Sequence, residues 1–220
     1  NRKSVVNISF AVLSFSACIW QFGYFMAYLS IDQKTASYWV KVVYIGVVFL
    51  PTTFYHFIIN FLDLKQYKKI VPFGYIVSGI FSFLTIFTNY FIDGVYKYFW
   101  GYYTKAAFLH HPFLLLFMSL WLLDIVLVLK EYNRKRKERL ALEANRLKYL
   151  LLAFIFVTIA SFDFLPSYGI SCYPFGYVFV IILLFILTYA IVKYRLMDIT
   201  VAITRTGVFV GVYTLVLGIP

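Results

Sequence analysis

Six apolar segments, each close to the length that crosses a lipid bilayer, constrain this chain more than any other feature of its sequence. A transmembrane α-helix needs about 20 predominantly apolar residues. The segments are Val5–Leu29, Trp39–Leu62, Ile70–Phe91, Pro112–Leu129, Tyr149–Pro166 and Phe175–Val192. Because lipid offers the backbone no hydrogen-bond partners, such segments are helices rather than open strands. The sequence therefore predicts an all-α fold, a polytopic transmembrane helical bundle with six complete helices.

The composition excludes a soluble domain. Hydrophobic residues make up 63% of the 220 residues and charged residues 13%, whereas soluble domains have roughly 45–50% and about 25%. The first apolar segment is too long, and is followed by too many others, to be a signal peptide. The net charge of +11 is explained by cationic loops, so we expect the lipid bilayer as a partner and no nucleic acid.

A further apolar run begins near Gly207 and continues to Pro220. We interpret it as a seventh helix that the sequence includes only in part. The chain then divides into residues 1–199 and the start of a further transmembrane helix at residues 200–220. Since the first residue, Asn1, is not Met, we interpret the chain as part of a longer protein, and a start at "NRKS" on the cytoplasmic side fits one more helix upstream that enters from outside.

The distribution of Lys and Arg predicts the orientation of the bundle. Sixteen of the 20 lie at the N-terminus and in alternate loops, and the other four are Lys34, Lys41, Lys97 and Lys105. Cytoplasmic loops carry an excess of these residues. We therefore expect Asn1 and residues 63–69, 130–148 and 193–206 to be cytoplasmic, in a plasma or inner membrane. Residues 130–148 read as a helical hairpin that contacts anionic lipid or a signalling domain.

Ionisable residues inside apolar segments are costly in a membrane and indicate functional candidates. His56 and Asp124 lie at a similar depth, roughly 8–9 Å inside the cytoplasmic boundary at about 1.5 Å per residue. One hypothesis is that they face the bundle interior and form a buried hydrogen-bonded or ionic pair. The alternative is that each binds a neighbouring hydroxyl or backbone group separately.

A third ionisable residue, Asp163, lies near the outer end of its segment, within "SFDFLPSYGISCYPFG". Pro166 ends that helix and Gly169 permits a turn, so the stretch reads as a tight external hairpin. Aromatic residues of the first two segments fall at a comparable depth, and an aromatic cavity with few polar groups is typical of a small-molecule site. The candidate ligand-binding residues are Trp20, Tyr24, Trp39 and Asp163. Chance abundance of aromatic residues is the alternative.

The external loop "IDGVYKYFWGYYTKAAFLHH" is rich in Tyr, Phe and Trp. Such residues gather at membrane interfaces, so the loop forms either an interfacial aromatic belt or a lid over an outward-facing pocket. We expect His110 and His111 to mark the solvent edge of the following helix. Adjacent helical residues point about 100° apart, so these two are poor joint metal ligands.

The sequence contains no GxSxG, HExxH, P-loop or GxGxxG motif, each of which would indicate a specific chemistry. Cys18 and Cys172 lack metal-ligand spacing. We therefore assign no catalytic residue, no metal and no cofactor to this chain.

Four stretches occur in an order that is familiar from one protein family: "NISFAVLSFSACIWQFGY", "FLPTTFYHFIINFL", "NRLKYLLLAFIFVTIASFDFLPSYGISCYPFGY" and "TYAIVKYRLMDI". They resemble the N-terminal seven-transmembrane region of bacterial sensor histidine kinases. The resemblance implies a sensory domain for a small or membrane-borne signal. It also implies a downstream cytoplasmic output module, most often a dimerising histidine kinase, and hence a homodimer of the full-length protein.

The segment "YAIVKYRLMDI" places cations at the inner interface, followed by a short amphipathic run. It is either an ordinary interfacial stop, with cations reaching the headgroups, or a joint that passes a helix shift to the output module. The family resemblance favours the joint. Its candidate signal-coupling residues are Tyr194, Arg195, Leu196 and Asp198.

Two other classes of function compete with a sensor. A transporter, or a substrate-binding membrane subunit, would have a polar path through the bilayer and helices broken near the midplane; Pro51 is the central proline here. An intramembrane enzyme needs paired catalytic groups at one depth, and His56 with Asp124 is the candidate pair.

Overall fold

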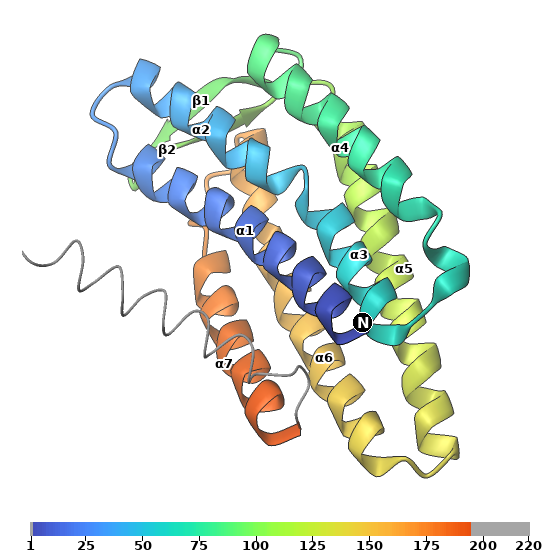
Figure 1. The fold of residues 1–220 in the computed structure, drawn as a ribbon. Helices are drawn as coiled ribbons and strands as arrows, with labels where there is room; N and C mark the ends of the chain where they lie inside the picture. Colours follow the sequence, from blue (N-terminus) through green and yellow to red (C-terminus); the bar gives the residue numbers. More distant parts are fainter. Residues whose placement is uncertain (1, 195–220) are drawn as a thin grey trace, which may run out of the picture.

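The computed structural model describes residues 2–194, which form a bundle of helices with one β-hairpin (Figure 1). The elements in chain order are α1 (Arg2–Tyr28), α2 (Gln33–Val47), α3 (Leu50–Leu62), the short 3₁₀ helix η1 (Lys65–Tyr67), α4 (Ile70–Phe87), β1 (Ile92–Tyr98), β2 (Gly101–Ala106), α5 (His110–Lys137), α6 (Ala141–Ala160), the 3₁₀ helix η2 (Ser161–Tyr168) and α7 (Gly176–Tyr194).

Five helical stretches of the described chain are long and apolar enough to cross a membrane: Val5–Tyr28, Gln33–Leu62, Lys65–Phe87, His110–Lys137 and Ala141–Tyr168. In addition, α7 has 19 residues and a length of about 28 Å, close to the roughly 30 Å of a hydrocarbon core. The expected helical membrane bundle is confirmed. The expected helix from Gly207 lies outside the described residues.

The second apolar segment, expected as one helix over Trp39–Leu62, is two helices with a break at Val48 and Phe49. The cause is Pro51, which has no N–H to donate to the carbonyl of Val47 four residues earlier. Thr53 restores the ladder after the break, because its backbone N–H and its hydroxyl both donate to the Phe49 carbonyl at 2.9 Å. Val47 and Val48 are buried, so protein rather than lipid covers the irregular backbone, as membranes require.

The aromatic loop between α4 and α5 folds into an antiparallel β-hairpin, which the sequence interpretation missed. Strand β1 pairs with β2 in the register Val95–Thr104 and Tyr98–Gly101. Successive strand residues point to opposite faces, yet the consecutive residues Tyr102, Tyr103 and Thr104 are all buried. Both faces of β2 are therefore covered by protein, and for the two tyrosines the interfacial-belt interpretation is wrong.

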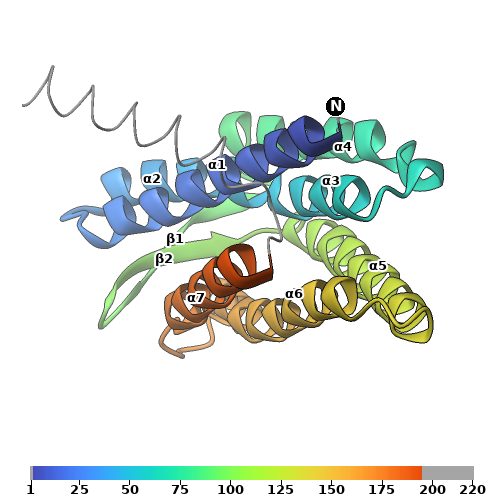
Figure 2. The ribbon, with the colours of Figure 1, turned by 60° about the horizontal axis from the view of Figure 1, so that its bottom comes forward.

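Two groups of helices enclose the hairpin. Figure 2 shows α1 and α2 on one side of the strands and α6 with α7 on the other, and β2 contacts both α2 and η2. The hairpin lies at the end of the bundle that also carries the α1–α2 loop (Figure 1). The N-terminus lies near the opposite end, beside the α3–α4 connection.

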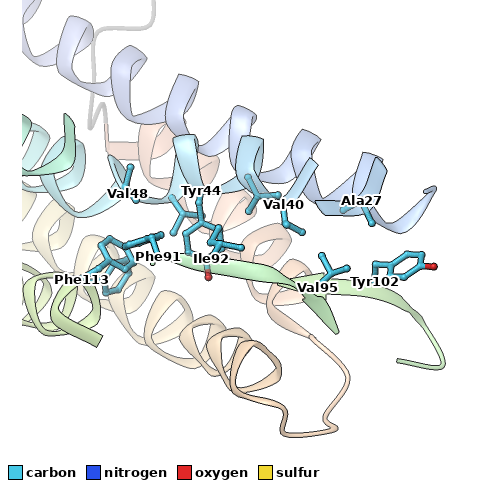
Figure 3. Close-up of a cluster of buried hydrophobic side chains, with 13 residues drawn as sticks. Ala27, Val40, Tyr44, Val48, Phe91, Ile92, Val95, Tyr102 and Phe113 are labelled. Carbon is cyan, nitrogen blue, oxygen red and sulfur yellow. The ribbon is translucent and has the colours of Figure 1, made fainter. Parts of the chain in front are cut away.

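The main hydrophobic cluster lies where α2 meets the hairpin. In Figure 3, Val40 and Tyr44 of α2 point toward Ile92 of the hairpin, and Phe113 of α5 closes the cluster beside Phe91. Each of these five side chains is buried. This cluster positions the hairpin and the start of α5 against α2.

The basic segment is a tight helical hairpin, as expected. Helix α5 ends at Lys137 and α6 begins at Ala141, and Arg139 turns the chain with a left-handed φ of 57°. Lys135 of α5 forms an ion pair with Glu143 of α6 at 2.5 Å, which joins the two helices beyond their apolar parts.

Two glycines bring the axes of α1 and α2 close together. A Cβ at Gly46 would lie 2.6 Å from both Ser16 O and Trp20 N, which are backbone atoms of α1, and a Cβ at Gly23 would lie 2.8 Å from Val43 Cγ2. Small residues at such contacts are typical of helices that pack in membranes. The α1–α2 pair therefore depends on the absence of side chains at these positions.

We predict that Gly46→Ala destabilises the protein, because the backbone of α1 has to move away from α2; overpacking of this kind costs about 1–3 kcal/mol. The measurement is thermal unfolding of the purified protein in lipid nanodiscs. Gly79→Ala is the matched control, since a Cβ there meets nothing within 4 Å. Equal unfolding temperatures for the two variants would show that the close contact between α1 and α2 does not contribute to stability.

Candidate functional site

A buried histidine joins three elements at the hairpin end of the bundle. His110, the first residue of α5, is fully buried. Its Nε2 lies 2.8 Å from the Tyr44 hydroxyl of α2, and its Nδ1 lies 2.6 Å from the Tyr168 hydroxyl of η2. A neutral imidazole has one donor and one acceptor nitrogen, and two tyrosine hydroxyls satisfy both.

The expectation that His110 marks a solvent edge is therefore wrong, although it holds for His111, which is exposed. The difference follows from helical spacing. His110, Phe113 and Phe117 share one buried face of α5, at the i, i+3, i+7 spacing of an apolar stripe, whereas His111 lies off that face. That spacing is the sequence signal that could have identified the buried histidine.

The hairpin is bound to η2 by two tyrosine hydroxyls. Tyr103 donates to the backbone carbonyl of Asp163 at 2.7 Å, and Tyr98 donates to the carbonyl of Pro166 at 2.7 Å. Burial raises the pKa of the Tyr103 hydroxyl well above its ordinary value, so it remains a neutral donor at physiological pH. Both bonds go to carbonyls of an irregular segment, and the Pro166 carbonyl also accepts the Gly169 N–H at 3.1 Å.

The side chain of Asp163 binds the first residue of α7. Its Oδ1 accepts a hydrogen bond from the Gly176 N–H at 2.9 Å. A carboxylate at this position is favourable because the first N–H groups of a helix lack partners and carry partial positive charge. A Cβ at Gly176 would collide with Asp163 Oδ2, so this contact needs glycine.

The structure brings two of the predicted ligand-binding residues together around Tyr103. Tyr24 stacks on Tyr103 with ring centroids 4.9 Å apart, and its hydroxyl lies 3.4 Å from Thr104 Oγ1. The backbone carbonyl of Asp163 accepts a hydrogen bond from the hydroxyl of the same Tyr103. Tyr24 therefore contacts the ring of Tyr103, and Asp163 contacts its hydroxyl.

The other two predicted residues, Trp20 and Trp39, are partly buried against the main hydrophobic cluster. Trp39 makes an edge contact with Phe22 at 5.8 Å. The described contacts of both indoles are with this cluster and with neighbouring aromatic rings. A role for Trp20 and Trp39 in binding a ligand together with Asp163 therefore stays a prediction.

Two buried polar atoms near the hairpin have no hydrogen-bond partner among the described residues: Trp100 Nε1 and Ser167 Oγ. Trp100 lies at the hairpin turn and stacks on Tyr98 at 4.4 Å, with Tyr173 at its edge. Buried polar groups normally have partners. Both atoms are buried polar groups without a partner by geometry, and sequence patterns gave no indication of them.

The predicted His56–Asp124 pair is not hydrogen-bonded in this structure. His56 Nδ1 lies 3.0 Å from the Tyr75 hydroxyl, as the alternative of separate partners expected. Asp124 is 1% exposed, and neither of its oxygens has a hydrogen-bond partner within the described part of the chain.

Of the signal-coupling residues, Tyr194 is the last residue of α7, while Arg195, Leu196 and Asp198 lie outside the described residues. Between residues 2 and 194, no group of three or more His, Cys, Asp or Glu side chains could hold a metal ion.

The geometry defines a multi-pass helical membrane protein with a polar and aromatic layer at one end. The sequence model of the family described as the N-terminal 7TM region of histidine kinase matches residues 1–200. Because the match covers most of the chain, the protein belongs to this family, as the resemblance of the four stretches indicated. No match was found among curated proteins or among solved structures.

We predict that His110→Phe lowers the free energy of unfolding, because it leaves the hydroxyls of Tyr44 and Tyr168 without their partner. An orphaned buried polar group costs about 1–3 kcal/mol. Thermal unfolding in nanodiscs measures the effect, with His111→Phe at the neighbouring exposed position as the control. Adding Tyr44→Phe should recover part of the loss; if His110→Phe unfolds like the control, the network does not stabilise the fold.

Proposed function

We propose that this chain senses a small or membrane-borne signal at its hairpin end and passes it through α7 to a cytoplasmic output module, a histidine kinase. Membership of the histidine kinase 7TM family supports a sensory domain. The observation that carries the proposal is the hydrogen bond from Gly176 N to Asp163 Oδ1, since it joins the hairpin layer to the helix that leads toward the output module.

The hairpin, η2 and α7 are bound in series. Tyr103 of the hairpin binds the backbone of Asp163, and the side chain of Asp163 binds Gly176. A ligand that moves the hairpin therefore moves the residue that caps α7. Ring contacts such as Phe156 with Phe179 pack α7 along α6, so a shift of the cap becomes a shift along that interface.

The ligand-binding end has the composition of a site for a small amphipathic molecule. Tyr24 of α1 stacks on the hairpin, and the two unpartnered atoms, Trp100 Nε1 and Ser167 Oγ, lie in the hairpin turn and in η2. Aromatic surfaces with few polar groups bind ligands that are mostly apolar. Trp20 and Trp39 extend this aromatic surface toward α1 and α2, and we include them in the proposed site.

The position of the output end is inferred from the distribution of Lys and Arg and from the length of α7. Helix α7 is 19 residues long and reaches about 28 Å from its cap. Because the Lys and Arg excess indicates that Asn1 and residues 63–69, 130–148 and 193–206 are cytoplasmic, α7 ends on the cytoplasmic face of a plasma or inner membrane. Packed helices have discrete arrangements, so Tyr194, Arg195, Leu196 and Asp198 can pass a small shift to the subunits of a homodimeric output module.

A transporter is the second candidate, and the break between α2 and α3 favours it, since broken helices line many transport sites. In those sites the unwound backbone faces ions or substrate. Here Val47 and Val48 at the break pack in the apolar core. The break therefore supports transport less than the family match supports sensing.

A comparison of three variants in the full-length protein tests the Asp163–Gly176 link. Asp163→Ala removes the cap, which costs about 0.5–2 kcal/mol, and Gly176→Ala displaces it; both should change basal autophosphorylation in the same direction. Asp163→Asn keeps an oxygen acceptor and should retain most of the wild-type output.

Gly79→Ala is the control, because it adds a methyl group in open space. If Asp163→Asn instead abolishes the response to the signal while Asp163→Ala leaves basal output unchanged, the carboxylate binds ligand and does not act as a cap. If all variants behave as wild type, the link through α7 is wrong.

The proposed orientation predicts the accessibility of two cysteines. In a Cys18→Ser background, a membrane-impermeant maleimide should label the native Cys172 in intact cells. It should label Arg136→Cys only after permeabilisation, because the α5–α6 turn is cytoplasmic. Labelling of Arg136→Cys in intact cells would reverse the topology and remove the route to a cytoplasmic module.

A further inference from the structure

An unpartnered carboxyl group lies in the interior of the bundle, away from the hairpin layer. Asp124 is on α5, where its neighbours one turn away belong to two apolar clusters shared with α3: Leu120 and Leu127 in one, Trp121 and Val128 in the other. The side chain is therefore on the face of α5 that packs against α3, between the two clusters, and it is 1% exposed.

Among the described residues, no salt bridge or hydrogen bond neutralises this carboxyl. Within the described chain, both of its oxygens are buried and lack a hydrogen-bond partner. A carboxylate that leaves water without gaining a cation or donors is strongly disfavoured, and the group takes up a proton instead. Elsewhere in the interior, polar side chains pair across helices, as in the bonds of Thr52 to Ser78 and of Trp121 to Thr158, and Asn60 Nδ2 of α3 is another buried polar atom without a partner among the described residues.

The titratable groups on the neighbouring elements are already engaged elsewhere. On α3, the hydroxyl of Tyr55 donates to the Tyr67 carbonyl at 3.1 Å. His56 of α3 and Tyr75 of α4 bind each other.

The remaining neighbours offer no counter-charge either. The apolar part of α6, residues 149–160, contains no Asp, Glu, Lys, Arg or His. On α5 itself, the nearest cation in sequence is Lys130, six residues and about 9 Å further along the axis. No cation therefore lies one helical turn from the carboxyl on its own helix or on the facing part of α6.

We propose that Asp124 is an intramembrane proton-binding site, whose carboxyl group is a neutral acid in the packed arrangement and releases its proton only when α3 and α5 separate enough to admit water. The depth of about 9 Å from Lys130 places the site nearer the basic end of α5 than the hairpin end. Protons therefore exchange with the aqueous phase on the basic side. The site stands apart from the proposed ligand site and does not depend on it.

Infrared difference spectroscopy of the purified protein in nanodiscs tests the proposal. A neutral carboxylic acid has a carbonyl band that is distinct from that of a carboxylate and shifts on exchange into D₂O. At neutral pH we expect wild type to show such a band and Asp124→Asn to lose the contribution of one carboxyl group. Asp63→Asn is the matched control, because Asp63 is exposed and has a left-handed φ of 58°, a conformation that asparagine accepts.

Identical bands in wild type and Asp124→Asn would overturn the proposal. A band that appears only when Na⁺ and K⁺ are replaced by a bulky organic cation would also overturn it, since the carboxylate would then bind a metal cation. If Asp124→Asn does not fold, labelling of wild type with a hydrophobic carbodiimide, which modifies neutral buried acids, replaces the comparison. Mass spectrometry should find the adduct on Asp124, and its absence there would reject the site.

Discussion

Every backbone N–H and C=O at membrane depth needs a hydrogen-bond partner within the protein, and the architecture follows from that constraint. Long helices satisfy it locally in the expected segments. Where the backbone is irregular, protein covers it: the break before Pro51 is enclosed by buried valines, and the carbonyls of Asp163 and Pro166 in η2 accept tyrosine hydroxyls from the hairpin. The irregular parts are thereby confined to the bundle interior and to the hairpin end.

The hairpin end joins elements that are distant in the sequence. Tyr44, His110 and Tyr168 bring α2, α5 and η2 together, and Asp163 extends this layer to α7 through Gly176. The hydrogen bonds there connect the hairpin to α7 as well as stabilising the fold. Under the proposed function, this connection is the route by which a signal would alter packing that is otherwise stable.

The bundle interior near the basic end of α5 differs from the hairpin end in how its polar side chains are paired. There the polar side chains occur as isolated pairs, such as His56 with Tyr75, and Asp124 has no partner among the described residues. A neutral acid is compatible with the surrounding apolar clusters, whereas an ionised one requires the helices to separate. The bundle thus contains two polar regions with separate chemistry, one at the hairpin end and one near the basic end.

The sequence by itself determined the helical class of the fold, the positions of the apolar segments, the charge asymmetry and the family, because hydrophobic length and cationic loops are local patterns. Helix α7 at Gly176–Tyr194 lies within two residues of its expected limits, and the turn at Gly169 has the left-handed φ of 84° that glycine permits. Only the tertiary structure decided the partners of the polar side chains. The bonds of His110 span 66 and 58 residues, and no local pattern encodes contacts over that distance. The hairpin was missed for the same reason, since covering both of its faces requires helices from both halves of the chain.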